Sequence, residues 1–205
     1  MTEPKKGFRI AAGILLLLLA CITLASYVSS LSALMKTDYA VADFRTWISA
    51  AGQLLAVIAV ILILARKFTG AGVMRALILA SSIAGWGVFF FILVRQTGMP
   101  DAETLFAVLP SLLILLVRLI SEVLIVVALF LHSRRSKGLL IAAAILSLSD
   151  TLLSAMQTAI QMANVGGGAK AMISYLGIHQ IIALIPFIAW LLLAFYFGAQ
   201  ENAEA

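Results

Sequence analysis

Six long, nearly uninterrupted apolar stretches limit the fold of this sequence more than any other feature. Each reaches the roughly 20 residues that a helix needs to cross a bilayer. The connections between them are short, and the period-2 alternation of a membrane barrel is absent. The sequence therefore predicts an all-α polytopic membrane protein, a single transmembrane helical domain over residues 1–205. Its six expected spans cover approximately residues 8–35, 45–65, 71–94, 104–131, 138–163 and 171–198.

The shortage of charged residues leads to the same fold class. Only 11% of the residues are charged and 63% are hydrophobic, whereas an ordinary soluble domain carries about 25% Asp, Glu, Lys and Arg. So few charges cannot cover the surface of a soluble protein of 205 residues. We expect an integral protein of a bacterial inner membrane, because the loops are minimal and no Asn-x-Ser/Thr acceptor is present.

The basic residues cluster on alternate connections and predict the orientation of the chain. In a six-helix path, all three clusters fall on the same side of the membrane. Since cytoplasmic loops carry the excess of Lys and Arg, both termini are predicted to be cytoplasmic. The net charge of +5 follows from this topology, and no motif indicates nucleic-acid binding. The clusters comprise Lys5, Lys6 and Arg9; Arg66 and Lys67, with Arg75 just inside the third stretch; and Arg134, Arg135 and Lys137.

Three ionisable residues, Arg118, Glu122 and Asp150, lie deep within the apolar stretches. Such residues cost about 2.5–3.5 kcal/mol each on insertion scales and are candidates for function. Arg118 and Glu122 are four residues apart and share one helical face. Asp150 is expected to face Arg118 at similar depth, because the fourth and fifth stretches form a hairpin. One negative charge is then left over, which a protonated carboxyl group, a protonated His179 or a bound cationic group would compensate.

Polar residues recur at three- and four-residue steps along the fifth stretch, from Ser147 to Gln161. Such a stripe cannot face lipid, so it must face protein or water. The sixth and second stretches also carry polar residues at depth. We therefore expect a polar pocket between the fourth, fifth and sixth helices, with a contribution from the second, open to the outside. Its candidate substrate-binding residues are Arg118, Asp150, Glu122, Gln157, Gln161, His179, Gln180 and Gln53.

Each of these residues also has a structural interpretation. An Arg–Glu pair one turn apart can fix the rotation of a helix, and Ser, Thr and Gln join membrane helices by hydrogen bonds of about 0.6 kcal/mol. No HExxH, paired-cysteine or GxSxG motif is present. We therefore predict no catalytic residue, no cofactor and no metal, and enzymatic activity is not indicated. A zinc site of His179 with carboxylates stays open as an alternative.

The leading hypothesis is a small transporter or substrate-binding membrane subunit for an anionic or zwitterionic solute. Arg118 would anchor the anionic group, and Asp150 or Glu122 would carry a proton or pair with a cationic group. Its expected partners are the bilayer, the solute and either a partner subunit or further copies of the chain, but no nucleic acid. In size and six-helix topology the chain resembles the substrate-binding subunits of energy-coupling-factor vitamin transporters. The alternative is a non-catalytic scaffold, assembly or accessory subunit whose buried charges are structural.

Overall fold

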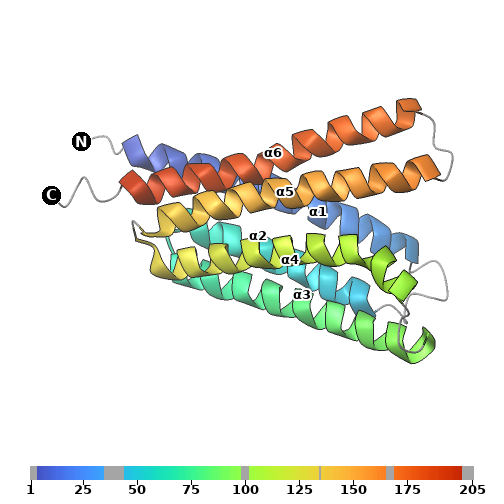
Figure 1. Ribbon diagram of the computed structural model, residues 1–205. Helices are drawn as coiled ribbons and strands as arrows, with labels where there is room; N and C mark the ends of the chain where they lie inside the picture. The colour runs from blue at the N-terminus through green and yellow to red at the C-terminus, as the bar shows by residue number, and fades with distance from the viewer. Residues whose placement is uncertain (1–3, 35–43, 98–101, 134, 165–168, 200–205) are drawn as a thin grey trace.

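The protein is all-helical throughout the part of the chain that the computed structural model describes, residues 4–34, 44–97, 102–133, 135–164 and 169–199 (Figure 1). The all-α prediction is thus confirmed. Each helix coincides to within four residues with one of the apolar stretches. The helices in these ranges are α1 (Pro4–Leu34), α2 (Phe44–Leu64), α3 (Phe68–Thr97), α4 (Ala102–Leu131), α5 (Arg135–Asn164) and α6 (Ala169–Ala199).

Four helical segments within the described ranges are long and apolar enough to cross a membrane: Lys6–Ser26, Phe68–Gly87, Leu109–Leu131 and Arg135–Ile160. The described parts of α2 and α6 hold shorter apolar stretches. Large apolar side chains also point outward, as Leu113, Leu116 and Ile120 do along α4. A soluble bundle would turn polar side chains to that surface, so this exposed face is compatible with a helix in lipid.

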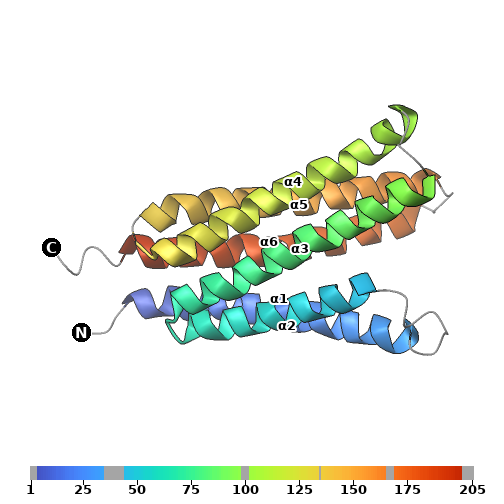
Figure 2. The same cartoon turned by 90° about the horizontal axis from the view of Figure 1, so that it is seen from below.

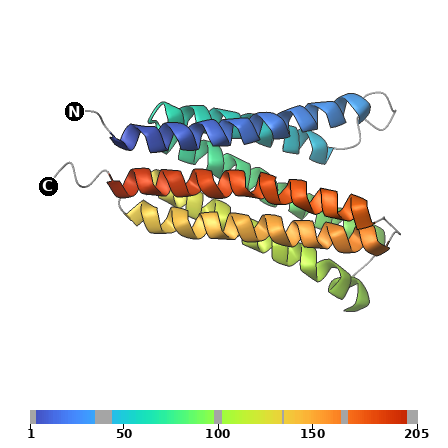
Figure 3. The same ribbon diagram turned by 90° about the horizontal axis from the view of Figure 1, so that it is seen from above.

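The six helices of the described ranges form a closed ring. Each helix contacts its neighbours in sequence, and α1 contacts α6. Figure 2 and Figure 3 show α1 and α2 on one side of the bundle and α4 and α5 on the other. The start of α1 and the end of α6 lie at the same end of the bundle (Figure 1). We name this the basic end, after its residues Lys6, Arg9, Arg66, Lys67, Arg135 and Lys137.

Side chains fill the centre of the ring at the basic end. The ring of Phe68 on α3 lies 4.9 Å from that of Phe197 and 5.9 Å from that of Tyr196, both on α6. Arg9 is only 5% exposed and donates to the carbonyl oxygens of Ile63 and Leu64, which end α2. The last carbonyls of a helix have no partner within it, so Arg9 caps α2 and ties α1 to it.

Gly13 marks a close approach of α1 to α2. A Cβ atom built on Gly13 would lie 2.6 Å from Cγ of Leu64, so Leu64 must move if any side chain is added. We expect Gly13→Val to lower the free energy of unfolding by about 1–3 kcal/mol through overpacking. Adding Leu64→Ala should recover part of that loss, which unfolding in mixed micelles would measure.

Gly7 provides the matched control for this prediction. It lies on the same helix, and a Cβ built there meets nothing within 4 Å. Gly7→Val should therefore leave stability nearly unchanged. Equal losses at the two glycines would show that the approach of α1 to α2 has no energetic consequence at Gly13.

Candidate functional site

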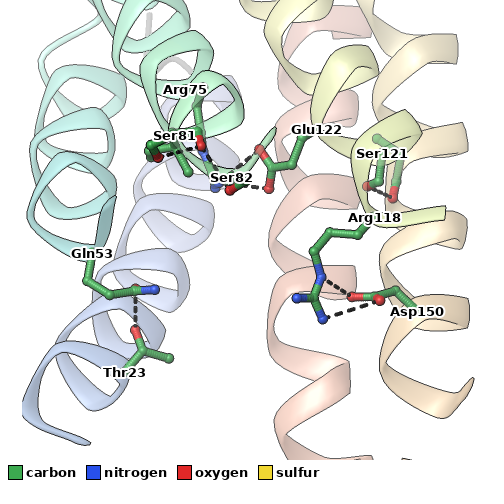
Figure 4. Close-up of polar contacts among 11 residues, drawn as sticks. Thr23, Gln53, Arg75, Ser81, Ser82, Arg118, Ser121, Glu122 and Asp150 are labelled. Carbon is green, nitrogen blue, oxygen red and sulfur yellow. Dashed lines mark hydrogen bonds and ion pairs between the residues drawn. The ribbon is translucent and has the colours of Figure 1, made fainter. Parts of the chain in front are cut away.

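Arg118 and Asp150 form an ion pair between the middle of α4 and the middle of α5. Nε of Arg118 donates to Oδ2 of Asp150 at 3.1 Å, and Nη2 donates to Oδ1 at 3.3 Å. Figure 4 shows the arginine reaching across to the carboxylate in this two-pronged arrangement. The Arg118 side chain is 55% exposed, whereas that of Asp150 is 13% exposed. The expectation that Asp150 faces Arg118 is confirmed.

Two further hydrogen bonds fix the register of α4 on α5, one on each side of this ion pair. The hydroxyl of Ser121 donates to the carbonyl oxygen of Ala143 at 3.0 Å. In the other direction along α4, Nε2 of Gln157 donates to the hydroxyl of Ser111 at 2.8 Å. Gln157 therefore faces α4, where it serves as an interhelical link beside the candidate site.

Glu122 pairs with Arg75 of α3. Nη1 of Arg75 donates to the two carboxylate oxygens of Glu122 at 3.0 and 3.2 Å. The guanidinium carbon lies 5.0 Å from the ring centroid of Trp190 on α6, a cation–π contact. The two partners are 13% and 23% exposed. Arg75 thus joins α3 to both α4 and α6, and Glu122 pairs with this arginine of α3, where the one-turn spacing had suggested a pair with Arg118 of its own helix.

The predicted surplus of one negative charge is wrong. It counted Arg118 against Glu122 and Asp150, and it assigned Arg75 to membrane topology. In the structure each carboxylate has its own arginine. The four charges at depth therefore sum to zero before any proton or solute is added.

A cavity of about 390 Å³ lies between α2, α3 and α4. The pocket predicted between the fourth, fifth and sixth helices involves side chains of α6 that lie outside the described part of the structure. Both ion pairs contribute to the wall of this cavity through Arg75, Glu122 and Arg118. The hydroxyls of Ser81 and Ser82 also line it, and both donate to the carbonyl oxygen of Ile78 within their own helix. The remaining lining residues that bear on function are Gln53, Gly85 and Trp86.

A second, smaller cavity of about 190 Å³ adjoins the first. It lies between α3, α4 and α5 and is lined by Ser111 and Gln157, among others. Trp86, Leu115 and Arg118 line both cavities. Arg118 therefore lies where the two cavities meet.

Gln53 lines the larger cavity and also links α2 to α1. The hydroxyl of Thr23 donates to Oε1 of Gln53 at 2.9 Å (Figure 4). Gln53, which the sequence predicted as an addition to the pocket, thus lies in the wall of this cavity. The side chains of Gln161, His179 and Gln180 lie outside the described part of the structure.

The polar stripe on α5 is resolved into two kinds of residue. Asp150 and Gln157 bond to α4, as described above. The hydroxyls of Thr151 and Thr158 instead donate to carbonyl oxygens one turn back in α5, those of Ser147 and Ser154. A hydroxyl that bonds within its own helix needs no partner on a neighbouring helix, so among the described polar residues of α5 these two threonines do not require a polar neighbour.

Arg75, Ser81 and Ser82 are lining residues that sequence reasoning missed. A signal for Arg75 was present, since it lies seven residues beyond Phe68 and hence about 10 Å into α3. Glu122 lies nine residues before Leu131, about 13 Å into α4 from the same end. Similar depth on consecutive helices was the basis on which Asp150 was paired with Arg118, and it applies equally here.

No group of three or more His, Cys, Asp and Glu side chains suited to a metal ion occurs among the residues searched, which are the described ones. Neither a scan against protein-family models nor searches of curated proteins and of solved structures finds a significant match. The function of the chain is therefore inferred from its own residues.

Proposed function

We propose that the chain crosses the membrane six times, with both termini on the cytoplasmic side of a bacterial inner membrane. The basic end supports this orientation, because it gathers Lys and Arg from the start of α1 and from two helix connections. The other end carries fewer basic residues. The lengths of α2 and α6, at 21 and 31 residues, are compatible with two further spans.

We further propose that the protein is a small transporter or solute-binding membrane subunit for a small anionic or zwitterionic solute. One observation carries this proposal: the Arg118 side chain lines a cavity at mid-depth and stays 55% exposed although it is paired. An arginine within an apolar membrane helix is costly to insert, so its presence there marks a candidate for function. Asp150 engages only two of its N–H groups, so the guanidinium has further donors with which to hold an anion.

The size and lining of the cavity define the solute further. Pockets for small molecules measure about 300–1,000 Å³, so a cavity of about 390 Å³ suits a compact solute. Ser and Gln side chains supply neutral hydrogen-bonding groups, and Trp86 supplies an apolar surface. Carboxylate and amino groups on one small molecule would match Arg118 and Glu122, which share this wall.

Filling the cavity should weaken solute binding without altering either ion pair. Gly85 lines the cavity, and a Cβ built on it meets nothing within 4 Å. We expect Gly85→Leu to weaken binding at least tenfold, because the added side chain occupies the space of the solute. Binding would be measured as the thermal stabilisation of the purified protein by a panel of small carboxylates and amino acids between pH 5 and 8.

Gly87 offers a matched control on the same helix. A Cβ built on Gly87 also meets nothing within 4 Å, and Gly87 is not among the residues that line either cavity. Gly87→Leu should therefore bind the panel as the unmodified protein does. If no member of the panel stabilises the unmodified protein, the proposal of a solute site fails; if both variants bind normally, the cavity is not the site.

A non-transporting scaffold is the second candidate function, and the Arg75–Glu122 pair favours it. This pair is largely buried, and Arg75 also stacks on Trp190, which is 2% exposed. Such an arrangement links three helices and leaves little of the arginine accessible. A scaffold role predicts that both ion pairs affect stability and that no solute binds.

A further inference from the structure

The two ion pairs differ in which partner faces the cavity. Arg118 is 55% exposed and its carboxylate partner is 13% exposed. In the other pair both partners are mostly buried, and Arg75 is held between Glu122 and the Trp190 ring. A solute that enters the cavity therefore meets the guanidinium of Arg118, with the Asp150 carboxylate lying behind it.

The geometry on Arg118 is that of a bound carboxylate. Two parallel N–H groups, on Nε and Nη2, reach two oxygens of one planar group. The distances of 3.1 and 3.3 Å are longer than the 2.7–2.9 Å of a tight charge-assisted pair. A carboxylate of a solute fits the same two donors, whereas a spherical anion such as chloride has no second oxygen to accept the second N–H.

Replacing Asp150 by a solute carboxylate on Arg118 needs no separation of α4 from α5. The Ser121–Ala143 and Gln157–Ser111 hydrogen bonds hold the two helices together on either side of the pair. Arg118 has a long side chain with half of its surface accessible, so rotation about its side-chain bonds is enough to turn it from Asp150 into the cavity.

For a solute carboxylate that brings no cationic group of its own, charge balance then requires a proton. The paired cluster is neutral, so a solute carboxylate on Arg118 leaves the Asp150 carboxylate buried without a cation. A buried carboxylate in that state is costly, and protonation removes the charge. From α4, the charged groups beside Asp150 are Arg118 and, one turn on, Glu122, which Arg75 already holds. On α6, the other helix packed against α5, the sequence offers His179 as a competing proton acceptor.

We propose that Arg118 forms a carboxylate-binding site, which Asp150 fills when no solute is bound. A solute carboxylate displaces Asp150 from Arg118, and the protein takes up one proton. The proton comes from the aqueous phase and forms an O–H bond on one oxygen of Asp150. The solute retains its own charge, and the site remains neutral overall. This inference rests on the proposed function and narrows the solute class to carboxylates that bind together with a proton.

Proton uptake on binding tests this inference directly. The full-length protein in detergent would be titrated with potassium acetate and potassium benzoate by calorimetry in buffers of different ionisation enthalpy, which gives the protons taken up per carboxylate bound. We expect about one for the unmodified protein. Asp150→Asn should bind at least tenfold more tightly, because the resident carboxylate is gone, and should take up almost none. His179→Gln should keep a ratio of about one.

Each other outcome has a distinct meaning. Binding without proton uptake by the unmodified protein overturns this inference and leaves the proposed solute site standing. Uptake that persists in Asp150→Asn but is lost in His179→Gln assigns the proton to His179 and also overturns it. If phosphate or chloride binds as tightly as acetate, the site does not select carboxylates, and that part of the inference is overturned. If neither the unmodified protein nor Asp150→Asn binds any of these anions, both proposals fail; Asp150→Ser serves as a second variant should Asp150→Asn not fold.

Discussion

Replacing Arg75 by Met is expected to lower the free energy of unfolding by about 3–5 kcal/mol. The substitution leaves the Glu122 carboxylate, 23% exposed, without its cation between α3 and α4, and removal of one partner of a buried pair typically costs this much. It also removes the cation that lies over Trp190, 5.0 Å from the ring centroid. Unfolding in mixed micelles with increasing SDS, followed by circular dichroism, would measure the loss.

Two comparisons make this prediction specific. Arg95→Met changes an exposed arginine in the last turn of the same helix and should shift stability by less than about 0.5 kcal/mol. Arg75→Met combined with Glu122→Leu removes both charges, and an apolar pair of similar volume is often as stable as a buried ion pair. The double variant should therefore recover most of the loss. If Arg75→Met is as stable as Arg95→Met, the Arg75–Glu122 pair makes no measurable contribution to stability.

The helices could be predicted from the sequence because their cause is local. Each apolar stretch satisfies its own backbone hydrogen bonds, so its identity does not depend on its neighbours. The Arg118–Asp150 contact could also be predicted, since α4 and α5 are consecutive and a short connection places equal depths side by side. In both cases the structure depends on residues that are close together in the sequence.

The other contacts of the candidate site could not be predicted, because they depend on how the helices close into a ring. The contact of α1 with α6 joins segments at opposite ends of the chain, and no spacing in the sequence encodes it. That closure brings Trp190 of α6 to Arg75 of α3. Arg75, which the sequence placed among the basic residues at the end of a helix, is therefore largely buried. Arg9 also caps α2, which the sequence did not predict, because its partners are the backbone carbonyl groups of Ile63 and Leu64 and carry no sequence signal.

The location of the cavity likewise follows from the ring. The sequence places polar residues on α5 and α6, which suggested a pocket there. On α5, however, Asp150 and Gln157 are engaged by α4, and two threonines are satisfied within their own helix. Polar side chains that already have partners do not require a cavity. The larger cavity found among the described residues lies between α2, α3 and α4, where small residues such as Gly52, Ser81 and Gly85 leave room.

Neutralising both members of the exposed pair separates a solute site from a scaffold. Arg118→Gln with Asp150→Asn removes two opposite charges together, so no buried carboxylate is left unpaired. Because Arg118 is 55% exposed, the pair itself should contribute at most about 1 kcal/mol to stability. The double variant is therefore expected to fold and to unfold within about 1 kcal/mol of the unmodified protein. Carboxylate binding, by contrast, should fall roughly ten- to hundredfold, since hydrogen bonds to a charged group contribute about 1.5–3 kcal/mol.

The comparison with Asp150→Asn alone shows which residue is responsible. Both variants lack the Asp150 carboxylate, but only the single variant keeps the guanidinium of Arg118. If Arg118 holds the solute, the single variant binds and the double variant does not, although both are folded by circular dichroism and monodisperse by gel filtration. If the double variant instead loses several kcal/mol of stability and neither protein binds a carboxylate, the pair is structural, and the scaffold function replaces the solute site.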